Sequence, residues 1–229
     1  MKTLIILALT LGLTVPLTAQ DELGKVVSTI GDVDVTAIST GNKFTPRVGT
    51  PILNDYKIRT GKRSYMEILL IDGTKIFVKE VTVLNISGLK MKETDPPTKL
   101  SMLTGKMRIT LKKTFRDRSL VLKTPTAIAG VRGTDFGAIA SRDETKLVVF
   151  EGKVEVANAE KDIIKSYIVK EREEVSVKKD LVPTEPRVVP QNILQKWFEY
   201  YDIDERSRII IRKDTEGGII DKMLRKREY

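Results

Sequence analysis

The feature that most constrains this chain is a period of two in its apolar residues, which recurs from Val26 to about Val177. Met107, Ile109 and Leu111, for example, alternate with basic or hydroxyl-bearing residues. Side chains of a β-strand point alternately to the two faces of a sheet, so this period predicts strands with one buried face. Because no segment of this stretch has a convincing helical period, the sequence predicts a mainly β fold.

Turn residues divide this pattern into short strands. Asp72-Gly73 lies between the apolar runs 68–71 and 76–78, which predicts a hairpin because Gly supplies the positive φ of a tight turn. Residues 147–150 are continuously apolar, which predicts a strand buried on both faces.

Three glycines each open an alternating stretch: Gly31, Gly105 and Gly152. Their unequal spacing excludes a regular repeat array and predicts similar β-turn-β corners in one stacked sheet. The alternative is that Gly followed by a charged residue and Val is simply a common way to begin a strand. We expect a solenoid-like or sandwich-like stacked β domain with a short C-terminal helical extension.

The composition excludes the commonest kinds of catalytic site. The chain has no Cys and no His, so disulfides, Cys-His and Ser-His-Asp sites cannot be built from it. The commonest zinc ligand is missing too. A pair of carboxylates could still hydrolyse a glycosidic bond, although the 31 acidic residues show no informative spacing. We expect a protein that is not an enzyme and has no metal or cofactor.

The first residues resemble an export signal. Lys2 precedes an apolar run over 4–13, and Ala19 supplies a small residue at a cleavage point. The run is shorter than the roughly 20 residues of a membrane-spanning helix. A buried core helix or an uncleaved anchor is the alternative. We expect residues 1–19 to be removed and the mature chain to begin at Gln20 or Asp21 in the periplasm.

Removal of Lys2 would leave a mature charge of +8, from +9 for the whole chain. A basic protein outside the cytoplasm does not normally meet nucleic acid. Its expected partners are other envelope proteins or anionic envelope polymers.

Residues 124–136 read TPTAIAGVRGTDF, and this segment closely resembles the signature of the FecR-type domain. Elements in the family's order flank it at 31–33, 58–61 and 149–156, so that the resemblance spans about residues 24–178. It implies an all-β extracytoplasmic module for sensing or scaffolding, without known catalysis. The motif residues that we expect to be structural are Thr124, Pro125, Thr126, Gly130, Val131, Arg132, Gly133, Thr134, Asp135 and Phe136.

Within the motif, Gly130 and Gly133 flank Val131-Arg132, which predicts a packed corner with positive φ or close backbone approach. Arg132 would then be partly buried and paired with Asp135 or Glu151, because a lone buried charge is costly. The alternative is that Arg132 faces a ligand.

A basic segment is the first candidate contact surface. Residues 99–123 are predicted to form a hairpin with eight basic residues against one acid, a net charge of +7. An anionic partner would meet its polar face, although a simply solvated strand face is the alternative. The residues expected to make this contact are Lys106, Arg108, Lys112, Lys113, Arg116 and Arg118.

The C-terminal part is the second candidate. Three prolines within 182–190 predict an extended linker. Residues 191–229 are predicted to begin with a helix that carries Trp197, Phe198 and Tyr201 on one side. This helix either docks a partner or covers an open end of the β domain.

Three functions remain open. The first is an envelope binding or scaffold protein, such as a component of a periplasmic assembly or filament sheath. The second is a soluble periplasmic sensor that relays a signal to a membrane or sigma-factor regulatory partner. The resemblance implies this role because the domain of the best-known FecR-type proteins lies outside the membrane and relays a signal to a sigma factor. The third is a carboxylate-based hydrolase of cell-wall glycans.

Overall fold

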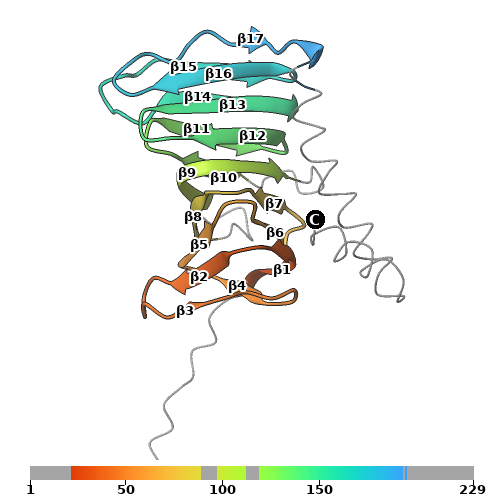
Figure 1. The fold of residues 1–229 in the computed structure, drawn as a ribbon. Helices are drawn as coiled ribbons and strands as arrows, with labels where there is room; N and C mark the ends of the chain where they lie inside the picture. Colours follow the sequence, from red (N-terminus) through yellow and green to blue (C-terminus); the bar gives the residue numbers. More distant parts are fainter. Residues whose placement is uncertain (1–21, 89–96, 112–118, 193, 195–229) are drawn as a thin grey trace, which may run out of the picture.

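A computed structural model describes residues 22–88, 97–111, 119–192 and 194 (Figure 1). These residues are mainly β, as the alternation predicts. The strands are β1 (Glu22–Ile30), β2 (Val33–Ala37), β3 (Lys43–Phe44), β4 (Pro51–Leu53), β5 (Tyr56–Thr60), β6 (Tyr65–Leu70), β7 (Lys75–Val78), β8 (Val83–Ser87), β9 (Thr98–Thr110), β10 (Ser119–Lys123), β11 (Ala127–Arg132), β12 (Asp135–Ala140), β13 (Glu144–Glu151), β14 (Lys153–Asn158), β15 (Ser166–Lys170), β16 (Glu173–Lys178) and β17 (Arg187–Val188).

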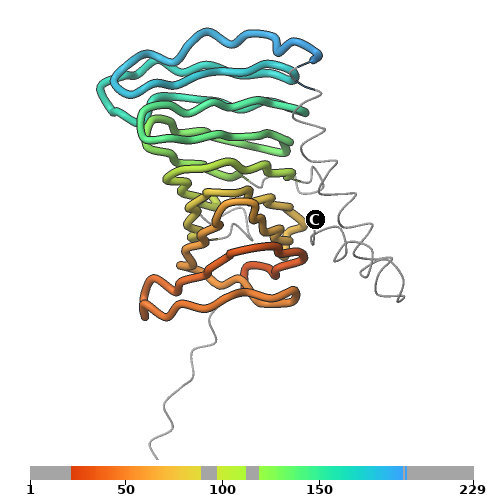
Figure 2. The backbone as a smooth tube through the Cα atoms, viewed as in Figure 1, coloured from red at the N-terminus to blue at the C-terminus, as the bar shows by residue number. Residues whose placement is uncertain are grey.

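The strands form two sheets that share β9. Sheet A has the order β4-β1-β6-β7-β9-β12-β13-β16-β17. Sheet B has the order β3-β2-β5-β8-β9-β10-β11-β14-β15. The chain passes back and forth between the sheets as it advances, so the strands stack in roughly sequence order from one end of the molecule to the other (Figure 2).

One hydrophobic core runs between the two sheets. Ile58 and Leu100 of sheet B and Ile68, Met107 and Phe136 of sheet A are all buried in the same cluster. Most side chains of the whole cluster are aliphatic, and many of them are β-branched, which favours strands. The alternation in the sequence therefore marks which side chains face this core.

The predicted hairpin around Asp72-Gly73 is confirmed. It joins β6 to β7, Gly73 has a φ of 81°, and the Asp72 carboxylate accepts a hydrogen bond of 2.8 Å from the Thr74 N–H. No helix among the described residues is long and apolar enough to cross a membrane.

The prediction of a hairpin over residues 99–123 is wrong. β10 lies parallel to the first half of β9, in the only parallel pairing of the described strands. The reason is that β9 crosses from sheet B to sheet A at Gly105, whose φ is 111°. The chain must therefore return to sheet B before β10 can pair.

The apolar run 147–150 is buried on both faces for a reason outside the strand itself. Leu147 and Val149 face the core, whereas Val148 points to the outer face of sheet A. Val189 and Leu194 cover Val148 there. Within the segment 182–190, Arg187–Val188 forms β17, which pairs with β16.

Candidate functional site

The start of the family motif holds the two sheets together. Thr124 and Thr126 are buried, and the Oγ1 atom of each lies 2.8 Å from Oγ1 of Thr145 on β13. The Thr126 hydroxyl also donates to the Val177 carbonyl at 2.9 Å. Thr124 Oγ1 accepts the Ala127 N–H at 2.9 Å. These hydroxyls satisfy one another inside the core, so their role is structural.

The Gly-Thr pair of the motif forms a corner next to Gly152. Gly133 has a φ of 58°, and the Thr134 hydroxyl bonds the Arg132 and Lys153 carbonyls at 3.0 and 2.9 Å. A Cβ on Gly152, whose φ is 90°, would meet Thr134 Oγ1 at 3.0 Å. Only a glycine fits this corner without strain.

The same corner occurs twice more. Ser64 packs on Gly31 and Thr82 on Gly105, and each hydroxyl bonds the carbonyl two residues before it. The residues that precede these hydroxyls, Arg63 and Val81, also have a positive φ, of 52° and 53°. The three glycines that the sequence singled out therefore share one structural device.

Arg132 and Gly130 differ from the prediction. Arg132 is exposed on the outer face of sheet B rather than partly buried. Gly130 has no positive φ, and a Cβ there would meet nothing within 4 Å. The reason is the alternation of β11, which turns Ala129 and Val131 to the core and Gly130 and Arg132 outward.

Asp135 pairs with Arg108 of β9. Nε and Nη2 of Arg108 donate to the two carboxylate oxygens at 2.8 and 2.6 Å, and the two side chains are only 18% and 12% exposed. The guanidinium also lies 4.9 Å from the centre of the Phe150 ring. The prediction of Arg108 as an exposed contact for an anionic partner is therefore wrong, because a neighbouring strand neutralises it.

Of the other predicted contact residues, the structure describes only Lys106. Lys106 is exposed on β9, on the outer face of sheet A. Lys112, Lys113, Arg116 and Arg118 lie outside the described residues, as do Trp197, Phe198 and Tyr201 of the predicted helix and the predicted signal segment 1–19.

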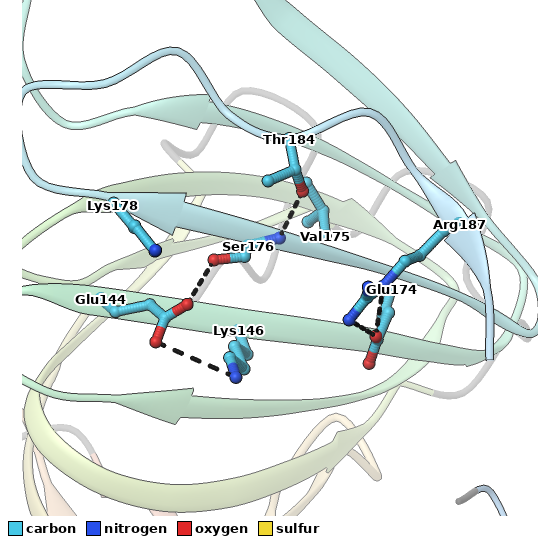
Figure 3. Close-up of a pocket in the computed structure, with 8 residues that line it drawn as sticks. All are labelled: Glu144, Lys146, Glu174, Val175, Ser176, Lys178, Thr184 and Arg187. Carbon is cyan, nitrogen blue, oxygen red and sulfur yellow. Dashed lines mark hydrogen bonds and ion pairs between the residues drawn. The ribbon is translucent and has the colours of Figure 1, made fainter. Parts of the chain in front are cut away.

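A polar cavity of about 200 Å³ lies where the segment before β17 crosses sheet A (Figure 3). Ser176 Oγ donates to Glu144 at 2.6 Å, and its N–H donates to Thr184 Oγ1 at 3.0 Å. Arg187 forms an ion pair with Glu174 at 2.7 Å. The residues that line the cavity are Glu144, Lys146, Glu174, Val175, Ser176, Lys178, Thr184 and Arg187.

The two carboxylates of this cavity are poorly placed for glycoside hydrolysis. Glu144 lies opposite Lys178, and Glu174 lies opposite Val148, so four residues of β13 separate their positions. That is roughly 13 Å of strand, against about 5–10 Å between the carboxyl groups of a glycosidase. Each carboxylate also holds a partner already, so the cavity is a junction that ties β17 and the segment before it to β16.

Apolar side chains are exposed at the end of the stack formed by β15 to β17, which is the blue end in Figure 1. Ile164 is 92% exposed and Ile168 is 46% exposed. We name the set the C-terminal end surface; it comprises Ile164, Ile168, Leu181, Val182 and Val188.

The sequence analysis missed this surface. The signal that could have found it is the unbroken apolar run Tyr167-Ile168-Val169, because a half-buried strand should place a polar residue at the position of Ile168.

Comparison with known proteins identifies the domain. Residues 56–155 match the model of the family described as FecR protein. The chain contains a FecR domain. The match runs from β5 into β14, so β1 to β4 and β15 to β17 lie outside it. The resemblance of the motif at 124–136 is confirmed.

Two crystal structures of a protein from Parabacteroides distasonis, provisionally described as an anti-sigma factor, share the fold of this FecR-domain protein. Their TM-scores are 0.50 and 0.51, both at 18% identity over 62% of this chain. The match covers 64% and 63% of those chains, so this protein spans less than two thirds of their length. No curated protein matches the chain.

Proposed function

We propose that this FecR-domain protein is a non-enzymatic, exported binding protein that relays a signal by contact with a second protein. The observation that carries the proposal is the FecR domain over β5 to β14, in a fold shared with a protein provisionally described as an anti-sigma factor. The conspicuous motif residues serve the fold, as the buried Thr124 and Thr126 and the Arg108–Asp135 pair illustrate. Specificity then belongs to surface features outside the motif.

A relay function is better supported than an envelope scaffold, because both the family and the structurally similar protein are regulatory. The hydrolase has the least support, since Glu144 of β13 and Glu174 of β16 lie far apart along the strand direction and each already has a partner. The apolar segment 4–13 and the small residue Ala19 support export to the periplasm, where a separate membrane protein would receive the signal.

The test is a deletion strain that is complemented by two forms of the gene. One form encodes the full chain, and the other lacks residues 2–19 and stays in the cytosol. We expect the deletion to change a discrete set of transcripts, and we expect only the exported form to restore them. An envelope defect without such a set would support the scaffold instead. Restoration by the leaderless form would contradict export.

A further inference from the structure

We propose that β15 is a docking edge that takes an extended segment of the partner protein as an added antiparallel strand. The partner strand places an apolar residue opposite Ile168 and an acidic residue opposite Lys170. The inference rests on the proposed function, because it specifies the chemistry of the partner in that relay.

The backbone of β15 shows an open edge. The strand pairs with β14 on one side, and no described strand pairs with its other side, since β16 pairs with β13 and β17. The Lys170 N–H donates to the Glu173 carboxylate at 2.8 Å, so it points away from β14. Backbone groups of every second residue point to the same side of an antiparallel strand. The N–H and C=O groups of Ser166 and Ile168 therefore point to the open edge as well.

β15 differs from the other edge strands in the described part of the chain. β3 and β17 have two residues each and β4 has three, whereas β15 has five. Short edge strands are one way in which proteins prevent unwanted pairing. β15 lacks this protection. Glu173 already holds the Lys170 N–H, so the backbone groups that β15 offers for strand addition, a common mode of peptide recognition, are chiefly those of Ser166 and Ile168.

Side chains on the outer face of sheet B set the chemistry of the added strand. Ile168 is 46% exposed there, so an apolar neighbour would bury it. Lys170 lies directly opposite Lys153 of β14, and both are exposed. Like charges opposite each other are unfavourable, and an acidic residue beside Lys170 would relieve the repulsion. The partner residues opposite Ile168 and Lys170 are two positions apart in the added strand, so their side chains point to the same face of the sheet.

A second copy of the chain fits this edge less well. Antiparallel pairing of two β15 strands about Ile168 would place Ser166, not an acid, opposite Lys170. The nearest acid on that face of each copy would be Glu155, which lies opposite Ile168 and not opposite Lys170. The charges therefore favour a strand from a different protein.

The test uses the full mature chain and a fluorescein-labelled, threonine-rich peptide with a central Glu-Thr-Val sequence. Read antiparallel, this order puts Glu opposite Lys170 and Val opposite Ile168. Binding is followed by fluorescence anisotropy at low salt. A matched peptide with Lys-Thr-Val should bind at least about tenfold more weakly, and added salt should reduce that difference. Equal affinity for the two peptides would overturn the assignment.

Two variants at one position separate the backbone from the side chain. Ile168→Pro removes the N–H that points to the open edge but leaves every hydrogen bond to β14 in place. It should therefore weaken binding of the Glu-Thr-Val peptide by roughly tenfold. Ile168→Thr keeps the N–H and the β-branch, so it should weaken binding only about fivefold or less. Thermal melts confirm folding of both. If the proline variant does not fold, the two-peptide comparison on the unaltered protein decides.

The outcomes distinguish this inference from the proposed function. If the deletion strain shows the discrete transcript response but neither folded variant changes peptide binding, the relay stands and the β15 assignment is wrong. If the peptide binds as expected but the transcripts do not respond, the docking edge stands and the relay is wrong. Self-association that Ile168→Pro abolishes would overturn the choice of a foreign strand.

Discussion

Substitution of Gly105 is the most severe test of the corner in which a hydroxyl-bearing side chain packs against a glycine of positive φ. It lies where β9 passes from one sheet to the other, and its φ is 111°. A Cβ there would lie 2.6 Å from the Thr82 Cβ, and Oγ1 and Cα of Thr82 are closer still. Thr82 cannot move away freely, because its hydroxyl accepts the Lys106 N–H at 2.9 Å.

Gly105→Ala should therefore be strongly destabilising. The positive φ costs an L-residue about 1–2 kcal/mol, and overpacking against Thr82 adds about 1–3 kcal/mol. The free energy of unfolding should fall by about 2–5 kcal/mol. For a domain of this size each kcal/mol lowers Tm by about 2–4 °C, so we expect a loss of roughly 4–20 °C.

The assay is thermal unfolding followed by circular dichroism, together with urea unfolding. Gly130→Ala is the matched control, because Gly130 has no positive φ and open space at the Cβ position. It should keep Tm or raise it slightly, since alanine restricts the unfolded chain. A Gly105→Ala protein that melts within 2 °C of the unaltered protein would refute the corner argument.

Three further predictions concern other parts of the fold. Thr126→Val should lower the free energy of unfolding by about 1–3 kcal/mol in urea titrations, because it leaves buried hydrogen-bonding partners unsatisfied; an unchanged midpoint would contradict this. Arg108→Ala and Asp135→Ala should show a favourable coupling of at least about 0.5 kcal/mol in a double-mutant cycle, and additive effects would mean that the pair contributes nothing. Val81→Gly should raise Tm by a few degrees, because an exposed β-branched residue at a φ of 53° is strained, whereas a lower Tm would show that Val81 is well accommodated.

Local signals in the sequence predicted local structure well. The alternation in β9 and β14 identifies core-facing residues, because it depends only on the geometry of a strand. Asp72-Gly73 predicted its hairpin because the turn chemistry lies within the four residues concerned. Gly31, Gly105 and Gly152 were identified as corners for the same reason, although their hydroxyl partners lie far away in the sequence.

Long-range partners could not be predicted in this way. The carboxylate that Arg108 would meet depends on β12 lying beside β9, and the motif spacing suggested Arg132 instead. The parallel placement of β10 depends on β9 crossing between sheets. The open edge of β15 likewise depends on which strands lie beside it, so alternation alone could not show it.

The central claim is that this FecR-domain protein works by binding another protein outside the cytoplasm, and photo-cross-linking in intact cells tests it most directly. A benzoylphenylalanine is introduced at Ile168, on the C-terminal end surface, and in a separate strain at Thr36, at the opposite end of sheet B. The account predicts that position 168 captures an envelope protein through a segment that mass spectrometry identifies as an acidic-x-apolar strand, and that position 36 does not. Capture of cytosolic proteins, equal capture from both positions, or no capture at all would contradict it.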